Sequence, residues 1–397
     1  MNILFITLAD IDLSQHGIYS DLVRYFTQQG HEMYIVSPVE RRHHKNTSYT
    51  TKENINLLSV KTLNIQKTNV IEKGIGTILL ERQFCNAIRR FLSHIKFDIM
   101  LYSTPPITLS KVIKYVKRTN ECAIAYLLLK DIFPQNAVDL GMLSKEGLLY
   151  RYFRKKERDL YMLSDYIGCM SPANKTFLLT HNPYIDAAKV EIAPNSIELH
   201  DDMIADRKSI LDKYNIPTDK TLFVYGGNLG KPQGIPFLIE CLDNNSTRKD
   251  CHFIIVGNGT EYGKLDRWYK AASPGNVTLL SRLPKDEYDH LIQACHVGLI
   301  FLDYKFTIPN FPSRLLPYLQ YKMPIIAATD PNTDVGQIAQ TNHFGYACLS
   351  NEAEAFSKCI DKMLSSDIKE MGENGYKYLA EHYTVANTYN TIIAHTK

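Results

Sequence analysis

Short runs of apolar residues alternate with amphipathic stretches along almost the whole chain. The apolar runs are continuous rather than alternating, which is typical of parallel strands covered on both faces. In the first half we expect strands at residues 3–8, 33–36, 98–103, 123–129, 166–170 and 190–193. In the second half we expect them at residues 221–225, 252–256, 277–280, 297–301 and 325–328. Helical patterns separate them, for example at 107–117, 234–242 and 286–295, and residues 352–397 read as a helical tail.

Two such series follow one another, which predicts two doubly wound, Rossmann-like α/β domains. Residues 195–210 carry no strong strand pattern, so we place the link between the domains there. We predict an N-terminal domain at 1–200, a C-terminal domain at 201–380, and a last helix at 381–397 that packs back towards the first domain. Because ligands of such sheets bind beyond the carboxyl ends of the strands, we expect the domains to face each other across a cleft that holds the site.

Charge is distributed unevenly along the 397 residues. The net charge is +3, but residues 1–200 carry a net charge of +6 and the rest carry −3. The basic residues gather at 41–45, at 151–158 and beside the apolar stripe of an amphipathic segment at 78–96. The simplest interpretation of each stretch is a solvated helix face. Together they favour contact with an anionic membrane surface or a lipid phosphate, and they disfavour nucleic acid, since no aromatic residues interleave with the charges.

Targeting signals and cysteine spacing indicate the compartment. The N-terminus shows no signal peptide, and no apolar run approaches the ~20 residues of a spanning helix. The eight cysteines form no CxxC pair and lie mostly in apolar runs, which indicates a reducing compartment without a disulfide framework or a zinc site. We therefore expect a cytoplasmic protein, with any membrane contact peripheral and at the inner face.

The second half contains two glycine-rich loops that directly follow predicted strands. Residues 226–234 read Gly-Gly-Asn-Leu-Gly-Lys-Pro-Gln-Gly and lead into a helix. Close backbone approach, a helix start and the charge of Lys231 predict a phosphate cradle, although a tight turn without a ligand fits as well. The second loop, at 256–261, contains Gly-x-Gly but does not complete a dinucleotide fingerprint. A third loop ends in Ser313 and Arg314 just before a helix at 315–321, where they would suit an anion.

The first half has fewer candidates. Asp131 follows a wholly apolar strand and is a candidate for catalysis or for binding sugar hydroxyls, while a simple turn cap is the alternative. His16 and Gly17 open the first helix, and His16 is expected to point towards the site. Asp10 and Asp12 form an Asp-x-Asp pair, for which we favour turn chemistry or substrate contact over a metal.

The order of these landmarks resembles family 4 of the GT-B glycosyltransferases over nearly the whole chain. The resemblance is strongest to the bacterial branch that builds O-antigen, capsule and exopolysaccharide repeats, including N-acetylfucosamine transferases. It rests on Gln-Gly-His-Glu at 29–32, Ser-Thr-Pro-Pro at 103–106, Asp-Ile-Phe-Pro at 131–134, Ala-Pro-Asn-Ser at 193–196, Gly-Asn-Leu-Gly at 227–230, Val-Gly-Asn-Gly at 256–259 and Pro-Ser-Arg at 312–314.

The resemblance implies a retaining, metal-independent hexosyltransferase without a cofactor, which moves a sugar from a nucleotide sugar, UDP-linked by the same analogy, to a lipid-linked saccharide. It assigns catalysis to Asp131 and His16. It assigns donor binding to Gly17, Gly227, Asn228, Lys231, Gln233, Gly257, Gly259, Arg282, Leu283, Phe311, Pro312, Ser313 and Arg314.

The chain departs from the wider family at four positions. Asn228 and Gln233 replace an Arg and a Lys that bind the diphosphate, and Pro309 and Pro317 replace both glutamates of a Glu-x7-Glu motif. The named branch shares the Asn and Gln. Two alternatives therefore stay open: a sugar-nucleotide epimerase on the same fold, and a non-catalytic protein on a decayed fold. A dehydrogenase is disfavoured, because no Gly-x-Gly-x-x-Gly follows the first strand.

Overall fold

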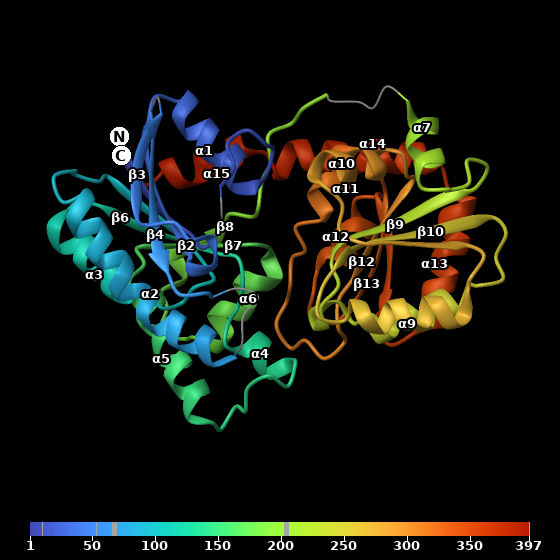
Figure 1. The fold of residues 1–397 in the computed structure, drawn as a ribbon, viewed down its shortest axis with the longest axis horizontal. Coiled ribbons are helices and arrows are strands. Elements are labelled where there is room, and N and C mark those ends of the chain that lie inside the picture. The colour runs from blue at the N-terminus through green and yellow to red at the C-terminus, as the bar shows by residue number, and fades with distance from the viewer. Residues whose placement is uncertain (10, 53, 66–69, 202–205, 397) are drawn as a thin grey trace. The chain divides into compact units, whose positions relative to one another are not determined.

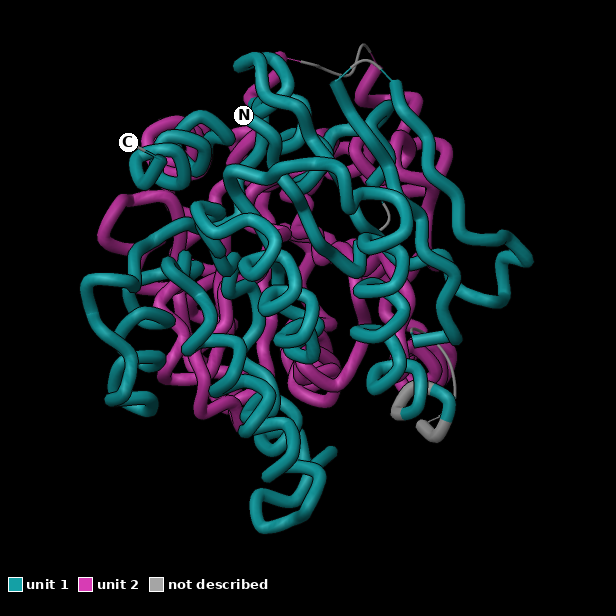
Figure 2. Tube along the Cα trace, turned by 90° about the vertical axis from the view of Figure 1, so that its left-hand side faces the viewer, with its two compact units in different colours: residues 1–198, 384–397 teal, residues 199–383 magenta. Residues whose placement is uncertain are grey.

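The computed structural model describes residues 1–397 except 10, 53, 66–69, 202–205 and 397. The chain forms two compact units, shown in different colours in Figure 2. Unit 1 comprises residues 1–198 and 384–397, and unit 2 comprises residues 199–383. The chain thus leaves unit 1 once and returns to it for its last helix. The predicted link at 195–210 includes this first crossing, but its residues 202–205 lie outside the described ones.

Unit 1 is built on an eight-stranded sheet with the order β3-β4-β2-β1-β5-β6-β7-β8. The strands are β1 (Asn2–Ile6), β2 (Glu32–Glu40), β3 (Ser48–Lys52), β4 (Ile55–Thr62), β5 (Ile99–Ser103), β6 (Ile124–Leu129), β7 (Tyr166–Cys169) and β8 (Val190–Ile192). All neighbours pair in parallel except β3, which pairs antiparallel with β4 at the edge. The chain moves outward from β1 in one direction and then returns to add β5 on the other side. That reversal is the switch point of a doubly wound sheet.

Helices cover both faces of this sheet. On one face, apolar side chains of α2 (Val70–Phe91), α3 (Ser110–Thr119) and α5 (Leu148–Leu163) join the core, and on the other α1 (Ile18–Gln28) and α15 (Val385–Ile393) do so. Short α4 (Gln135–Asp139) and α6 (Pro172–His181) complete the unit. The returning helix α15 is fixed by Tyr389, whose ring lies 5.0 Å from that of Phe26 and whose hydroxyl lies 2.9 Å from His31 Nε2.

Unit 2 has a six-stranded parallel sheet with the order β11-β10-β9-β12-β13-β14. Its strands are β9 (Thr221–Asn228), β10 (Cys251–Asn258), β11 (Val277–Leu280), β12 (Val297–Phe301), β13 (Ile325–Thr329) and β14 (Gly345–Leu349). Its helices are α7 (Arg207–Lys213), α8 (Ile235–Asn244), α9 (Tyr262–Ala272), α10 (Lys285–Gln293), α11 (Leu315–Gln320), α12 (Val335–Thr341), α13 (Ala353–Ser365) and α14 (Ile368–His382) (Figure 1). The strand order reverses between β9 and β12, which is the switch point of this unit.

The predicted fold class, two doubly wound parallel α/β domains, is confirmed, but several elements differ. The amphipathic segment expected at 78–96 belongs to α2, which ends at Phe91, and the helix expected from residue 107 begins at Ser110. The pattern missed β3, β4 and β14. Strand β3 is an edge strand whose side chains are mostly exposed, so it lacks the apolar run that marks a buried strand.

Candidate functional site

The carboxyl ends of β9 and β12 are bridged by one tyrosine hydroxyl. These strands pair only at Val297–Phe223 and Gly298–Val224. Beyond that point the hydroxyl of Tyr318, on α11, accepts a hydrogen bond from the Gly226 N–H of β9 at 3.2 Å. It lies 3.3 Å from the Val224 carbonyl oxygen of β9 and 3.5 Å from the Leu299 carbonyl oxygen of β12. Tyr318 therefore links the two strands below the loops that follow them, at the switch point where doubly wound sheets open a crevice.

The glycine-rich loops after β9 and β10 pack directly on each other. Gly257 has φ +154° and is the register partner of Gly227, and a Cβ atom on it would clash with the Gly227 carbonyl oxygen. The ring of Tyr288, from α10, packs against Gly226, so a Cβ atom on Gly226 would clash with the Tyr288 hydroxyl. These close approaches explain the glycines at 226 and 257 by packing, before any ligand is considered.

The loop at 229–234 is more internally bonded than the sequence predicts. The N–H groups of Leu229, Gly230, Gln233 and Gly234 donate to Asn258, the Gln233 side chain, Gly230 and Lys231 respectively. A 3₁₀ turn at Lys231–Gln233 also separates the loop from α8. These four N–H groups are therefore already bonded within the protein, and the phosphate cradle at 226–234 stays a prediction. Lys231 itself is exposed at the surface.

Gln233 orders this loop. Its Oε1 accepts hydrogen bonds from Gly230 N–H at 3.2 Å and from Asn228 Nδ2 at 3.1 Å. The two residues that depart from the basic pattern of the wider family therefore bind each other. They shape the loop rather than supply charge to it.

Arg314 is the cation of this crevice. Its Cζ lies 4.2 Å from the ring centroid of Tyr225, the buried tyrosine of β9, and its Nη2 lies next to Gly227. Nη1 is buried and finds no hydrogen-bond partner among the described residues. Leaving a buried, charged N–H unpaired costs free energy that an anionic ligand would recover.

A buried carboxylate holds the loop that carries Arg314. Asp330, directly after β13, accepts hydrogen bonds from the N–H groups of Asn332 and Thr333, and burial raises its pKa although these bonds oppose the shift. Thr333 Oγ1 in turn accepts from the Asn310 N–H at 2.9 Å. Phe311 follows, buried, with its ring 5.6 Å from that of Tyr383. The approach to Pro312 and Ser313 is thereby fixed.

The remaining predicted donor residues lie at the same edge of the sheet. Arg282 and Leu283 follow β11, two strands away from β9, and Arg282 is exposed. Gly259 follows β10, and its position is as tight as that of Gly257, because a Cβ would clash with the Leu229 backbone. Arg314 precedes α11, whose six residues make a weak helix dipole, so charge is the property that Arg314 brings.

In unit 1, Thr104 organises the segment that contains Asp131. Its Oγ1 accepts hydrogen bonds from the N–H groups of Lys130 and Asp131 and donates to the Asp131 carbonyl. The Asp131 carboxylate accepts a 2.7 Å hydrogen bond from Asn136 Nδ2. Burial nonetheless raises the pKa of Asp131 to about 6. A carboxyl group with a pKa near neutrality can take and return a proton under cellular conditions.

Lys130 directly precedes Asp131, and burial shifts its pKa in the opposite direction. Burial lowers the pKa of Lys130 to about 7, and its Nζ donates to the Ala193 carbonyl at 3.1 Å. The motif at 193–196, noted in the sequence, therefore contacts the segment of Asp131 through this lysine. Two adjacent groups with perturbed pKa values mark a functional-site candidate.

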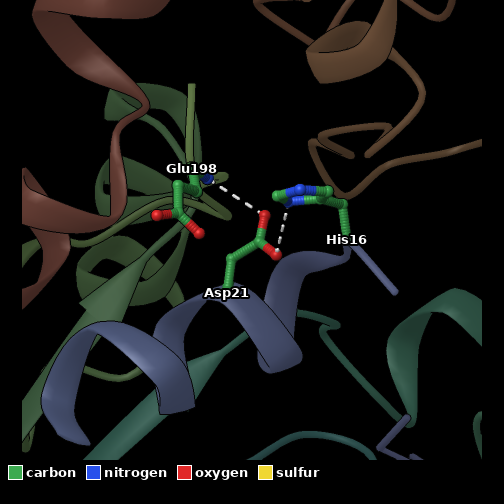
Figure 3. A group of neighbouring side chains, drawn as sticks. All are labelled: His16, Asp21 and Glu198. Carbon is green, nitrogen blue, oxygen red and sulfur yellow. Dashed lines mark hydrogen bonds and ion pairs between the residues drawn. The ribbon is translucent and has the colours of Figure 1, made fainter. Parts of the chain in front are cut away.

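His16 belongs to a network centred on Asp21 (Figure 3). His16 Nδ1 lies 3.3 Å from Asp21 Oδ1, and the buried Asp21 also accepts from the N–H groups of Gly17 and Glu198 at 3.0 Å each. Arg24 forms an ion pair with Asp21 and places Nη2 3.2 Å from His16 Nδ1 and 3.6 Å from Glu198 Oε2. Asp21 thus fixes both the His16 loop and the last residue before the chain leaves unit 1.

The triad of His16, Asp21 and Glu198 has the composition of a metal site, but Arg24 already supplies a cation to all three. In the Asp-x-Asp pair, Asp12 caps Ser14 through its N–H and hydroxyl, as expected for turn chemistry, while Asp10 lies outside the described residues. His16 and Asp131 follow β1 and β6, which β5 separates in the sheet.

Sequence reasoning missed the residues that hold the candidates in place. Tyr225, Tyr288 and Tyr318 surround Arg314 but lie on three elements, so no local motif joins them. Asp21 could have been noticed, since it lies one helical turn after Gly17 and a carboxylate there can cap the first turn of the helix.

One comparison with known proteins concerns unit 2. The sequence model of the family described as Glycosyl transferases group 1 matches residues 206–378. The match covers less than half of the chain and shows that residues 206–378 are similar to a glycosyl transferases group 1 domain. The crevice between β9 and β12 and the loop that carries Arg314 both lie within these residues.

Curated relatives extend beyond this region. The chain is 21% identical over 318 residues to WbjE of Pseudomonas aeruginosa, assigned as a glycosyltransferase, covering 77% of this chain and 78% of WbjE. It is 25% identical over 189 residues to WcaI of Escherichia coli K12, assigned as a colanic acid biosynthesis glycosyl transferase, covering 47% and 42%.

Solved structures show the fold of the whole chain. Sucrose-phosphate synthase from Thermosynechococcus elongatus superposes with a TM-score of 0.75 at 14% identity, covering 99% of both chains. Anabaena HepE, crystallised with UDP and glucose, gives a TM-score of 0.70 at 12% identity, covering 99% and 98%. The chain therefore has the GT-B fold, and the region similar to the group 1 family lies in its second half.

Proposed function

We propose that the chain is a retaining glycosyltransferase that needs no metal and transfers a hexose from a UDP-sugar to a lipid-linked saccharide. The observation that carries the proposal is the buried, unpaired Nη1 of Arg314 at the switch point of unit 2, in the region similar to the group 1 family. A nucleotide diphosphate is the ligand class that such a crevice and such a charge bind. The solved structure of HepE with UDP and glucose supports the choice of UDP.

In this proposal unit 2 holds the donor. Arg314 pairs with the diphosphate, exposed Lys231 adds a second charge, and Gly227 with Gly257 lets the phosphates approach the backbone. The remaining proposed contacts are Asn228, Gln233, Gly259, Arg282, Leu283, Phe311, Pro312 and Ser313. When the bond between the sugar carbon and the diphosphate breaks, the negative charge of the leaving group grows. A preorganised cation that needs no rearrangement stabilises that charge.

Unit 1 supplies the acceptor side. The Asp131 carboxylate takes the proton of the acceptor hydroxyl as the hydroxyl oxygen bonds to the sugar carbon, and its pKa of about 6 suits this role near neutral pH. His16, oriented through Nδ1 by Asp21, binds the transferred sugar or the acceptor through its remaining ring nitrogen. Gly17 holds the loop of His16 through its N–H to Asp21.

The acceptor class follows from the charge of unit 1 and from the relatives. Residues 1–200, which carry the excess of basic residues, suit a lipid diphosphate. The assignment of WcaI to colanic acid biosynthesis supports a role in surface polysaccharide synthesis. We propose that the enzyme works in the cytoplasm, at the inner face of the membrane. Among the described residues, no helix combines the length and apolar character needed to cross a bilayer.

The test is sugar transfer with purified protein. UDP-glucose, UDP-galactose and UDP-N-acetylglucosamine are each offered with a polyprenyl-diphosphate saccharide, and UDP release and the glycolipid product are measured. We expect UDP release that depends on the acceptor, a product with the anomeric configuration of the donor, and activity in the presence of EDTA. Asp131→Asn should abolish transfer without abolishing UDP binding. Conversion of the donor sugar without an acceptor would instead show an epimerase, and no turnover with intact UDP binding would show a decayed enzyme.

A further inference from the structure

Exposed apolar side chains gather on one side of unit 1. Eight of the eleven large hydrophobic residues exposed in the described part of the chain lie between residues 75 and 79 or between 142 and 162. They are Ile75, Ile78, Leu79, Met142, Leu148, Leu149, Tyr152 and Met162. Leu148 is 82% exposed and Leu149 is 61% exposed. Clusters of this kind on a soluble domain mark a contact surface.

Residues 75–79 lie on α2 and residues 148–162 on α5, and both helices pack against α3. Glu81 on α2 forms a 3.4 Å ion pair with Lys156 on α5, and it also accepts a hydrogen bond from Ser110 on α3. On both outer helices the exposed apolar residues precede this ion pair in the sequence. We call Ile75, Ile78, Leu79, Leu148, Leu149 and Tyr152 the apolar rim. The inward sides of the same helices are buried against the sheet, so the rim faces outward.

The exposed charge around the apolar rim is predominantly positive. On residues 75–91, on α3 and on α5, the exposed charged residues are all basic. They are Arg82, Arg89, Arg90, Lys111, Lys114, Arg118, Arg151, Lys155 and Arg158. The acidic residues of these stretches are Glu81 and Glu157, which are buried and paired with Lys156 and Arg154, and the half-buried Asp159. Just before α5, Lys145 and Glu146 are both exposed, so the exposed charge around the apolar rim is predominantly, but not wholly, positive.

We propose that the apolar rim and its basic surroundings dock unit 1 on an anionic lipid bilayer. Leu148, Leu149 and their neighbours enter the boundary between headgroups and acyl chains, and the lysines and arginines contact the phosphates. A second copy of the chain is a poorer occupant, because it would bring the same positive surface into contact with itself. An apolar rim bordered by mainly positive charge suits a bilayer, which is apolar inside and anionic at its surface.

Helix α5, which carries Leu148, Leu149 and Tyr152, packs against the segment that follows Asp131. Phe133, two residues after Asp131, packs its ring 4.9 Å from that of Phe153 on α5, and the Tyr150 hydroxyl lies 3.5 Å from Gln135 Oε1. Docking would therefore place the acceptor residues near the membrane surface. This last step rests on the proposed function, since it takes the acceptor to be lipid-linked; the docking itself does not.

Vesicle binding of the full-length protein tests the inference. Vesicles of phosphatidylcholine alone, and of phosphatidylcholine with an equal amount of phosphatidylglycerol, are sedimented with wild type, with Leu148→Ser/Leu149→Ser and with Arg151→Glu/Lys155→Glu. The matched control is Arg267→Glu/Lys358→Glu, which reverses two exposed charges of unit 2. Each basic residue near such a surface contributes about 1 kcal/mol, so reversing two should lower partitioning at least about tenfold.

We expect wild type and the control to bind anionic vesicles, to release them at high salt and to bind neutral vesicles weakly. Both variants of the rim should lose binding, with unfolding midpoints and UDP affinity unchanged, because the altered side chains are exposed. Wild type that ignores anionic vesicles, or a control that loses as much binding as the rim variants, would overturn the inference. The inference would also be overturned if the rim variants bound vesicles as wild type does and lost only self-association of the protein. Vesicle binding without UDP binding would overturn the proposed function alone.

Discussion

The Arg314 guanidinium lies over the ring of Tyr225, with 4.2 Å between Cζ and the ring centroid. Tyr225 belongs to β9 and Arg314 to the loop after β12, so this contact joins the two sides of the switch-point crevice. The stacking orients a cation whose Nη1 has no partner among the described side chains and backbone groups. A guanidinium held in this way meets an incoming diphosphate with little further ordering.

Replacing Arg314 should weaken nucleotide binding selectively. We expect Arg314→Met to raise the Kd for UDP at least about tenfold, the effect of losing a charge-assisted hydrogen bond of ~1.5–3 kcal/mol. Titration calorimetry measures the Kd, and Arg267→Met, which removes an exposed arginine of the same unit, is the control. Equal affinities for UDP in wild type and Arg314→Met would exclude this arginine from the donor site.

Tyr318 should matter for stability more than for ligand affinity. Tyr318→Phe leaves the Gly226 N–H without its acceptor in a fully buried place, which costs ~1–3 kcal/mol. Denaturant unfolding should show this loss, while Tyr304→Phe, at an exposed tyrosine of the same unit, should change little. Unchanged stability in Tyr318→Phe would mean that the hydroxyl does not bridge the strands.

Asp131 should make stability depend on pH in an unusual direction. Burial raises the folded-state pKa of Asp131 to about 6 from 3.8. Between pH 3.8 and 6 the folded protein therefore keeps a proton on Asp131 that the unfolded chain has released. Its stabilising contribution is present below about pH 4 and is lost as the pH rises through 6. Asp131→Asn should therefore gain in unfolding midpoint relative to wild type as the pH rises from 4 to 7. A pH-independent difference would contradict the raised pKa.

Lys130 should show its effect at higher pH. Burial lowers its folded-state pKa to about 7 from 10.5, so the unfolded chain binds more protons between these values and stability rises with pH across that window. The gain in stability of Lys130→Met over wild type should be largest at and below pH 7 and smallest near pH 10. The loss of the hydrogen bond to the Ala193 carbonyl lowers this gain at every pH. Chemical unfolding at several pH values checks the trend, and the opposite slope would refute it.

Asp21 should act by positioning. Asp21→Asn removes the charge that holds Arg24, His16 and the Glu198 N–H, and we expect a loss of ~2–3 kcal/mol in stability together with a lower kcat. A purely structural role would leave the kcat of the folded enzyme unchanged, whereas a loosened His16 should lower it. Asp12→Asn, at an exposed carboxylate of the same loop, is the control. UDP affinity should stay at the wild-type value in both variants.

The sequence predicted the parts of the fold that depend on local pattern. Buried parallel strands such as β6 are continuous apolar runs, and the glycines at 226–234 follow a strand as expected. The alternating, half-exposed β4 and the polar edge strand β3 carry weaker signals, and both were missed. In the site, the charge of Arg314 and the carboxylate of Asp131 could be proposed from motifs. Their supports, Tyr318 and Thr104, could not, because those contacts join residues distant in the chain.

Thermal unfolding with UDP, GDP, CMP and NAD at millimolar concentration tests the central claim most directly, with Arg314→Met measured beside wild type. A ligand at a hundredfold excess over its Kd adds ~2.7 kcal/mol of stability, which should raise the midpoint by at least about 3 °C. The account predicts that UDP raises the midpoint of wild type, that NAD does not, and that Arg314→Met loses most of the shift. No shift with any nucleoside diphosphate, or a UDP shift that Arg314→Met retains in full, would contradict a donor site at this crevice.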